Sequence, residues 1–176
     1  DTGLTLVSHL RRTGRLTHTS LPCKSVNGRH LGLFIQLDDG CGMAFHDQRR
    51  FGTAKIMNAH DAESLWGRLG HEPLERSFNT AAMRLILKNR KRSMKSLLLD
   101  QGHIAGIGNI YADESLFRAG IHPERLAYLV REAEADLLVR AIKDTLRTAI
   151  QLEGSSIDTY VTAKGDPGRF QETFKV

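Results

Sequence analysis

The sequence of 176 residues is poor in cysteine and has no long apolar run. Its two cysteines, Cys23 and Cys41, are far apart and have no second Cys or His at metal-ligand spacing. We therefore expect no disulfide framework and interpret both as reduced thiols of a cytosolic protein. No apolar run approaches membrane-spanning length, and the N-terminus lacks the charged-then-apolar pattern of a signal peptide. These absences exclude a membrane protein and favour a globular protein of the cytoplasm.

Acidic residues are missing from one stretch of a basic chain, whose net charge is +5. No acid lies between Glu75 and Asp100, while seven cations do: Arg76, Arg84, Lys88, Arg90, Lys91, Arg92 and Lys95. A solvated helix face usually mixes charge signs, so a run of one sign favours binding of phosphates. An ordinary solvated surface is the alternative.

The hydrophobic pattern predicts an α+β fold. Strands are expected at residues 4–10, 31–37, 42–45 and 53–57, with a hairpin turn at 38–40 and a loop at 18–28. After a turn-like connector at 70–74 the period becomes helical, with helices expected at 79–89, 93–100, 109–119 and 131–152. A short helix at 61–69 precedes them, a loop at 155–168 follows, and residues 170–176 resemble a strand. We accordingly predict domains at 1–74, 75–153 and 154–176.

Within these elements, cap residues and buried faces are predicted from side-chain type and spacing. Asp61, Asn79 or Thr80, and Asn109 are the expected helix caps. The buried helix positions are expected to be Leu65, Trp66 and Leu69 in the first helix, Ala82, Met83, Leu85 and Ile86 in the second, and Leu137, Leu138, Ala141, Ile142, Thr145 and Ala149 in the longest.

The connector between the helices at 93–100 and 109–119 is the first candidate site. Gly106 and Gly108 allow the backbone to approach a partner closely, and Asn109 can cap the following helix. Asp113 and Glu114 are expected in the first turn or so of that helix, where the helix dipole favours negative charge. A helix start beside paired glycines is a natural phosphate site, although a purely structural turn is the alternative. A dinucleotide loop is rejected, because Tyr111 stands where the third glycine would be.

The second candidate site is the cluster Arg49, Arg50 and Phe51. Two guanidinium groups can bind phosphates, and an adjacent aromatic ring can wedge between bases or stack on them. A surface arginine pair beside a core phenylalanine is the alternative. The histidines form no metal set by spacing, and His30 and His46 at strand edges either face DNA or are simply exposed. From the residues alone we infer a basic, two-part protein that holds a nucleic-acid backbone.

Residues 98–101 and 104–123 together closely resemble the helix-two-turn-helix motif of bacterial formamidopyrimidine-DNA glycosylases, of which the endonuclease VIII enzymes are looser relatives. Shorter matches lie before and after this motif in the family's order, at residues 9–10, 13–14, 47 with 49–52, 69–70 with 72–74, 154–156 and 165–171. The resemblance covers essentially the whole chain. It implies part of an N-terminal β-sandwich followed by a helical domain, with duplex DNA containing oxidised bases held between them by a monomer. The implied activity is excision of oxidised purines, namely formamidopyrimidines and oxidised guanine, followed by strand cleavage.

The resemblance also implies roles for particular residues. Those matching DNA-binding positions are His30, Arg49, Arg50, Arg90, Lys91, Lys95, Asn109 and Tyr111. Those expected to fill the space left by a flipped-out nucleotide are Arg12, where the family usually has Met, together with Arg49 and Phe51. Those expected near the lesion are Glu114, Ser155, Ser156, Gly165, Arg169 and Phe170.

Several residues that the family uses for catalysis have no counterpart here. Family members begin with a nucleophilic Pro and a Glu, carry a catalytic Lys soon after, and end in a four-cysteine zinc finger with a catalytic Arg. We therefore expect an internal fragment of a longer bacterial repair enzyme, with no catalytic residue and no metal ligand in this chain, and with zinc in the full-length protein. The alternatives are a non-catalytic DNA-binding module or degenerate relative, and an oxidised-pyrimidine glycosylase of the endonuclease VIII type.

Overall fold

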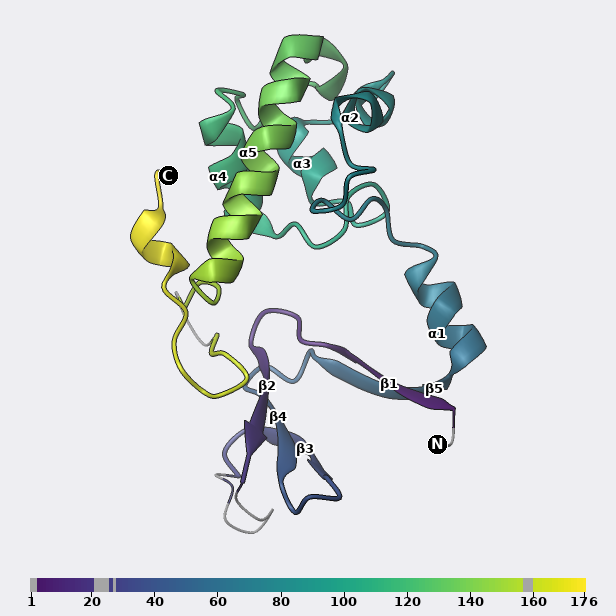
Figure 1. The fold of residues 1–176 in the computed structure, drawn as a ribbon, viewed down its shortest axis with the longest axis vertical. Coiled ribbons are helices and arrows are strands. Elements are labelled where there is room, and N and C mark those ends of the chain that lie inside the picture. The colour runs from purple at the N-terminus through teal and green to yellow at the C-terminus, as the bar shows by residue number, and fades with distance from the viewer. Residues whose placement is uncertain (1–2, 21–25, 27, 157–159) are drawn as a thin grey trace. The chain divides into compact units, whose positions relative to one another are not determined.

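The computed structural model describes residues 3–20, 26, 28–156 and 160–176, and the chain divides into two compact units. The strand unit comprises Asp1–Ala62 and Gln151–Thr173, and the helical unit comprises Glu63–Ile150 and Phe174–Val176. Figure 1 shows strands in the first and helices in the second. The α+β fold class is therefore confirmed. The boundaries between units fall within α1 and near the end of α5, whereas the domain limits at 74 and 153 stay predictions.

The strand unit contains two small antiparallel sheets. In one, β1 (Leu4–His9) pairs with β5 (Thr53–Asn58), and Leu4 lies opposite Asn58. In the other, β4 (Gly42–Asp47) lies between β2 (Gly14–Thr19) and β3 (Leu31–Gln36). The four predicted strands are confirmed. The fifth, β2, was not predicted and includes the first two residues of the expected loop at 18–28. Much of that loop, including Cys23, lies outside the described residues.

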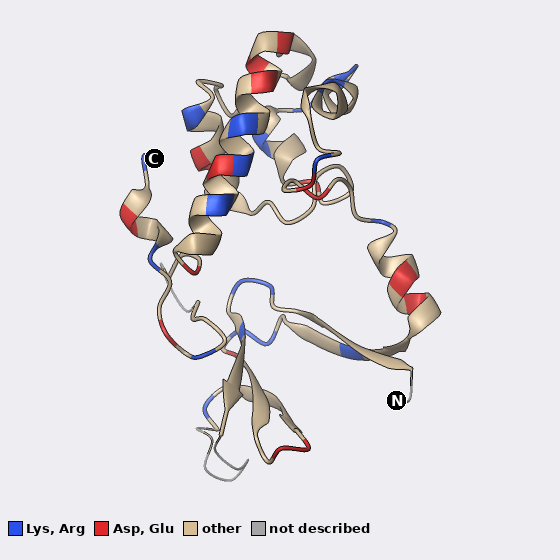
Figure 2. Ribbon diagram, in the orientation of Figure 1, with Lys and Arg blue, Asp and Glu red and all other residues tan. Residues whose placement is uncertain are grey.

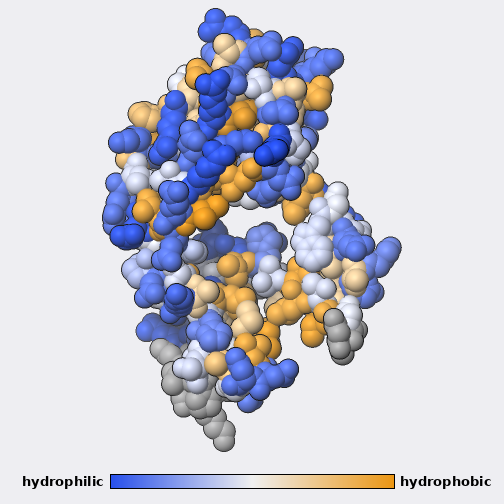
Figure 3. All heavy atoms as spheres, viewed as in Figure 1, coloured by the Kyte–Doolittle hydropathy of each residue, from blue (hydrophilic) through white to orange (hydrophobic). Residues whose placement is uncertain are grey.

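The hairpin turn predicted at 38–40 is confirmed. The amide of Gly40 donates to the carbonyl of Leu37 at 3.1 Å, and Gly40 has a φ of +81°, which glycine adopts without strain. The central strand β4 is the best-buried strand of its sheet, with Ala44 and Phe45 in the interior. In β1 and β5, by contrast, Leu4, Leu6 and Ile56 are exposed, and Figure 3 shows hydrophobic atoms at the surface of this unit.

The helical unit holds most of the buried apolar side chains. Its elements are α2 (Thr80–Leu87), α3 (Met94–Leu98), α4 (Asn109–Arg118), the short 3-10 helix η2 (Ala127–Leu129) and α5 (Glu132–Gln151). α1 (Ala59–Trp66) leads into it. The core includes Phe78, Met83, Met94, Leu97, Leu98, Ile104, Ile107, Leu116, Leu138 and Ile142, each at most 2% exposed. The predicted helices therefore all form.

The caps and buried faces agree with the sequence in part. Asn79 caps α2 by accepting from the amide of Ala82 at 3.1 Å, as predicted. The prediction that Asp61 caps α1 is wrong, because the Asn58 side chain accepts from the Asp61 amide at 2.8 Å. Two positions expected to be buried are exposed. Leu85 is 73% exposed and Leu137 is 51% exposed.

Two further expectations fail at opposite ends of the chain. Leu65, Trp66 and Leu69, expected to form the buried side of the helix at 61–69, are 40–50% exposed, and the one buried residue of α1 is Ala62. The strand expected at 170–176 is instead the 3-10 helix η3 (Phe170–Thr173). Among the described residues, no helix combines the length and apolar character needed to cross a membrane.

Candidate nucleic-acid interface

The connector between α3 and α4 owes its course to Gly106. This residue has a φ of +75°, in the left-handed region, and a Cβ built on it would meet no atom within 4 Å. Glycine is therefore favoured at position 106 by the left-handed backbone conformation and not by a lack of space for a side chain. Gly108, which precedes α4 as its cap residue, has an ordinary φ of −100°. The predicted turn between the helices is present, and its glycines play different roles.

The start of α4 is free of acidic groups. The prediction that Asn109 is the cap residue is wrong: Gly108 caps the helix without a side-chain hydrogen bond, and Asn109 is the exposed first helical residue. Asp113 and Glu114 lie just beyond the first turn. The helix start therefore offers the positive end of the helix dipole with no carboxylate of its own first turn beside it. This arrangement suits an anionic ligand.

Gln101 holds the connector in place, a role that the sequence did not reveal. Its Oε1 accepts from the amide of Gly106 at 2.7 Å, and its Nε2 donates to the carbonyl of Ile107 at 3.0 Å. One side-chain amide thus forms hydrogen bonds to both an N–H group and a carbonyl group of the backbone just before α4. The only signal in the sequence is a glutamine five residues before the left-handed glycine.

Three of the seven cations in the acid-free stretch are committed to ion pairs within the helical unit. Arg84 pairs with Glu132 at 2.9 Å, Arg92 with Asp100 at 2.6 Å and Lys95 with Asp113 at 2.8 Å. The hydrogen bond from Arg92 is the main reason that the pKa of Asp100 is lowered. The acids lie outside the stretch, so sequence proximity could not reveal these pairs.

The other four cations of the stretch are exposed and make no ion pair with a described residue: Arg76, Lys88, Arg90 and Lys91. Arg90 and Lys91 follow α2 through Asn89, whose φ is +59°. The backbone carbonyl of Arg90 accepts from the amide of Tyr128 at 3.2 Å, which fixes this turn. Tyr111, by contrast, packs against the core from α4. The predicted DNA-binding residues of this unit thus differ in exposure, since Arg90 and Lys91 are exposed and Tyr111 is half-buried.

A shallow groove of about 430 Å³ runs along α3, close to Lys95. It is lined by Arg92, Ser93, Lys95, Ser96, Leu99, Asp100 and Glu124. Both charge signs line it. Figure 2 likewise shows basic and acidic segments interspersed along the helices. Its mixed lining does not by itself select an anion.

In the strand unit, Asp47 organises the second candidate site. Its buried carboxylate accepts from the Thr13 hydroxyl, from the amide of Gly52 at 2.6 Å and from the amide of Arg49 at 3.2 Å. These hydrogen bonds, led by the one from Thr13, lower the pKa of Asp47. The carboxylate therefore ties the turn at 48–52 to the turn at 11–13, and basic segments of both turns are blue in Figure 2.

The side chains carried by these turns are exposed. The guanidinium of Arg49 lies over the ring of Phe51 at 5.4 Å, and Phe51 is 61% exposed, so the alternative of a core phenylalanine is wrong. Arg12 and Arg50 are also exposed. His30 is half-buried, and its carbonyl accepts from the Asp47 amide at 2.9 Å. The structure thus brings these predicted residues together around Asp47, whose organising role the sequence did not reveal.

His46 does not fit either expectation for it. It was expected to face DNA or solvent, but its side chain is buried in β4 and only 8% of the residue is exposed. The alternation of the strand does not predict this, because burial in β4 continues over four successive residues, 44 to 47.

The loop from Gly154 to η3 is closed by hydrogen bonds within the strand unit. Ser156 Oγ accepts from the amide of Gly168 at 2.8 Å, and its own amide donates to Gln171 Oε1 at 3.0 Å. Ser155 forms an isolated bridge with Arg169. Beside them, Phe170 is fully buried. Ser155, Ser156, Arg169 and Phe170 therefore lie at the base of this loop.

The remaining two expected lesion residues are Gly165 and Glu114. Gly165 occupies the exposed part of the loop with a φ of +93°. Glu114 belongs to the helical unit and is 1% exposed. Its Oε1 accepts from the amides of Lys175 and Val176 at 2.8 and 3.1 Å, while its buried Oε2 has no hydrogen-bond partner among the described residues.

The fold and these features define the class: an α+β protein with a strand unit and a helical unit of the helix-two-turn-helix type. Residues 69–161 match the formamidopyrimidine-DNA glycosylase H2TH domain, and residues 1–54 match the N-terminal domain of the same enzymes. The chain belongs to the formamidopyrimidine-DNA glycosylase family, which confirms the resemblance inferred from the sequence.

Individual relatives support the same assignment. The formamidopyrimidine-DNA glycosylase of Acidiphilium cryptum is 42% identical over 178 residues, covering 100% of this chain and 63% of that protein. The crystal structure of the MutM (Fpg) protein of Thermus thermophilus matches with a TM-score of 0.85 at 38% identity, over 98% of this chain and 64% of that one. A Lactococcus lactis Fpg variant, solved in complex with DNA containing Fapy-dG, matches with a TM-score of 0.85 at 32% identity, over 97% and 62%. The chain thus spans just under two thirds of the length of these relatives.

Proposed function

We propose that the protein to which this chain belongs is a base-excision-repair DNA glycosylase with lyase activity that removes oxidised purines from duplex DNA. The family assignment and the Fapy-dG complex of the Lactococcus lactis relative support this proposal. The observation that carries it is the acid-free start of α4 behind the Gly106 turn, because such a helix start binds phosphate.

In the proposed complex, the helical unit binds the DNA backbone. The amides at the start of α4 and the side chain of Asn109 donate to one phosphate, and Arg90, Lys91 and Lys95 bind others. Contacts of this kind position the protein and carry no base sequence information. Lys95 keeps Asp113 as an alternative partner at 2.8 Å, so its contribution to DNA binding is smaller than that of the exposed Arg90 or Lys91.

The turns held by Asp47 take part in base flipping in this proposal. Chemistry on a base of duplex DNA requires the nucleotide to leave the stack. The exposed ring of Phe51 and the guanidinium of Arg49 are already stacked on each other, and they enter the vacated space together with Arg12. Arg50 and His30 add contacts to the backbone.

Lesion recognition is assigned to the loop at 155–170 and, separately, to Glu114. The closed base of the loop positions its exposed part, including Gly165, without fixing it by core packing. The buried, half-satisfied carboxylate of Glu114 offers one oxygen as an acceptor for a donor on the damaged base. A carboxylate acceptor selects N–H donors, which formamidopyrimidines and oxidised guanine present.

The excision step itself is proposed for the whole protein. An amine attacks the sugar carbon that bears the base, and the bond from that carbon to the base breaks, so that the base leaves. Opening of the sugar ring then gives a Schiff base, from which the strand is cleaved by elimination. The family's zinc finger requires four cysteines, whereas this chain has two, so the zinc expected in the whole protein is not held by this chain through that motif. We place the protein in the bacterial cytoplasm, at the chromosome.

The test is borohydride trapping of the complete protein on duplex DNA containing oxidised guanine. We expect a covalent adduct, and its absence contradicts the enzymatic proposal. Salt-sensitive duplex binding without an adduct supports a DNA-binding module instead. Stronger trapping on an oxidised pyrimidine supports the endonuclease VIII type.

The Phe51→Ala variant tests the flipping role in the same assay. Stacking of a base on an aromatic ring is worth about 1–3 kcal/mol, so trapping at limiting enzyme should fall by roughly 5- to 150-fold. Phe117→Ala is the matched control, since Phe117 is similarly exposed, at 55%, on α4. Equal effects of the two changes contradict the proposed role of Phe51.

A further inference from the structure

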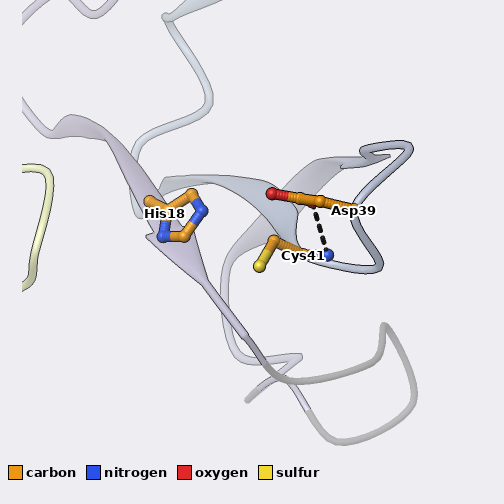
Figure 4. A group of neighbouring side chains, drawn as sticks. All are labelled: His18, Asp39 and Cys41. Carbon is orange, nitrogen blue, oxygen red and sulfur yellow. Dashed lines mark hydrogen bonds between the residues drawn. The ribbon is translucent and has the colours of Figure 1, made fainter.

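Three side chains with metal-binding atoms meet at one end of the β2–β4–β3 sheet. The ligand atoms of His18, Asp39 and Cys41 all lie within 4.8 Å of one another. Figure 4 shows the Asp39 carboxylate and the Cys41 thiol directed toward the imidazole ring of His18. They come from β2 and from the turn between β3 and β4, so their spacing in the sequence gave no sign of a metal set.

The backbone holds these residues in this arrangement. His18 lies opposite Met43 and Thr19 opposite Gly42, so Cys41, which directly precedes β4, falls diagonally across from His18. The turn is closed by a hydrogen bond from the amide of Leu37 to the carbonyl of Cys41 at 2.9 Å. The amide of Cys41 donates to Asp39 Oδ1, also at 2.9 Å, which fixes the carboxylate beside the thiol.

The donor set identifies the class of metal. A thiolate, an imidazole and a carboxylate are each ordinary ligands of zinc, whereas magnesium and calcium require oxygen ligands. Zinc bonds of about 2.0–2.3 Å in a tetrahedron place ligand atoms about 3.3–3.8 Å apart. The three atoms therefore need to move together by about 1–1.5 Å at most, which side-chain rotation provides. His18 and Asp39 are exposed and Cys41 is half-buried, so water can occupy the fourth position.

A metal at this place would compensate for a small core. Among the described residues, the three-stranded sheet buries only two apolar side chains, those of Ala44 and Phe45. Small folds with limited cores are commonly stabilised by a metal or another cross-link. A metal bound by His18, Asp39 and Cys41 would link the edge strand β2 to the turn between β3 and β4. Binding free energy gained in this way adds to the stability of the folded state.

We propose that His18, Asp39 and Cys41 form a zinc-binding site that fastens β2 to the β3–β4 turn. Binding replaces the thiol proton of Cys41 with the metal ion and releases that proton to solvent. The site shares no residue with the predicted DNA-binding set, although the backbone amide of His18 donates to the carbonyl of Ala163 in the loop at 155–170 at 2.8 Å. The proposal does not rest on the proposed function.

The test is a titration of the metal-free 176-residue chain with Co²⁺, whose thiolate charge-transfer absorption reports a bond to sulfur. We expect an absorption that saturates at one equivalent and disappears when Zn²⁺ is added. The absorption should be lost in Cys41→Ser. The affinity for Co²⁺ should fall at least about tenfold in His18→Ala, since replacing even a residue that hydrogen-bonds to a metal ligand lowers metal affinity by about 10- to 100-fold. No absorption, or absorption that survives Cys41→Ser, overturns the proposal.

Matched variants separate ligand loss from misfolding. Asp39→Asn keeps an oxygen that can accept from the Cys41 amide, so the turn is retained while the carboxylate ligand is lost, and the affinity should fall. Cys23→Ser and His60→Ala remove the same residue types elsewhere, and both should bind Co²⁺ as the unaltered chain does. Loss of binding in either control, or full binding in Asp39→Asn, refutes this set of ligands.

Discussion

Replacing Gly106 with alanine should destabilise the helical unit, while the same change at Gly108 should not. Both glycines lie in the connector between α3 and α4, and a Cβ at either would meet no atom within 4 Å. They differ in backbone conformation, with φ of +75° at Gly106 and −100° at Gly108. The pair therefore isolates the conformational requirement from packing.

The magnitude follows from the energy of the left-handed conformation. An L-residue there costs roughly 1–2 kcal/mol, and the loss of chain entropy in the unfolded state returns about 0.4–1 kcal/mol of that. Gly106→Ala should thus lower the free energy of unfolding by about 1 kcal/mol. At Gly108 the same entropic gain is offset by the poorer cap that alanine makes, so the change should stay within about 0.5 kcal/mol.

The assay is urea unfolding followed by helical circular dichroism, with the midpoint compared at an unchanged slope. Gly106→Asn is the diagnostic variant, because asparagine tolerates the left-handed region and should recover much of the lost stability. The reasoning is refuted if Gly106→Ala unfolds at the same urea concentration as the unaltered chain, or if both alanine variants lose equal stability.

Two further predictions concern packing and pH. Met83→Ala should lower the free energy of unfolding by about 2–5 kcal/mol, because Met83 is fully buried. Leu85 on the same helix is 73% exposed, so Leu85→Ala should be nearly neutral. Similar urea midpoints for the two variants would contradict the placement of Met83 in the core. Hydrogen bonds from Arg125 and then Arg131 lower the pKa of Glu134 from 4.5 to about 2, so its contribution to stability is complete above about pH 4.5 and is lost as the pH falls toward 2. The free energy of unfolding should therefore decline less steeply between about pH 6 and about pH 2 in Glu134→Gln than in the unaltered chain. Parallel declines in the two proteins would contradict the stabilising role of the Glu134 carboxylate.

Local patterns in the sequence were sufficient for most of the fold. The strands expected at 4–10, 31–37, 42–45 and 53–57, the turn at 38–40 and the cap at Asn79 depend on neighbouring residues, and all are confirmed. The failures occur where tertiary contacts decide. Leu85 has the apolar character of a buried residue, but α2 presents Leu87 to the core in its place. The end of the chain lacks a strand partner in the described structure, and residues 170–173 form a 3-10 helix.

The candidate interface was predictable as a list of residues but not as an arrangement. The glycines and cations can be read from the sequence, whereas the groups that hold them cannot. Asp47 acts through hydrogen bonds to Thr13 and Gly52, and Gln101 acts through the backbone of the connector. The pairing of Lys95 with Asp113 joins residues 18 apart in the chain. Such pairings depend on three-dimensional proximity, for which a single sequence carries no local signal.

The most direct test of the central claim is the salt dependence of duplex-DNA binding by the 176-residue chain. Each phosphate contact contributes about 0.9 to the slope of log K against log salt. Arg90→Gln and Lys91→Gln should each reduce the slope by about that amount. Arg147→Gln, on α5 beside Asp144, should leave the slope unchanged. A slope that falls equally in all three variants, or in none, would contradict the claim that Arg90 and Lys91 bind the DNA backbone.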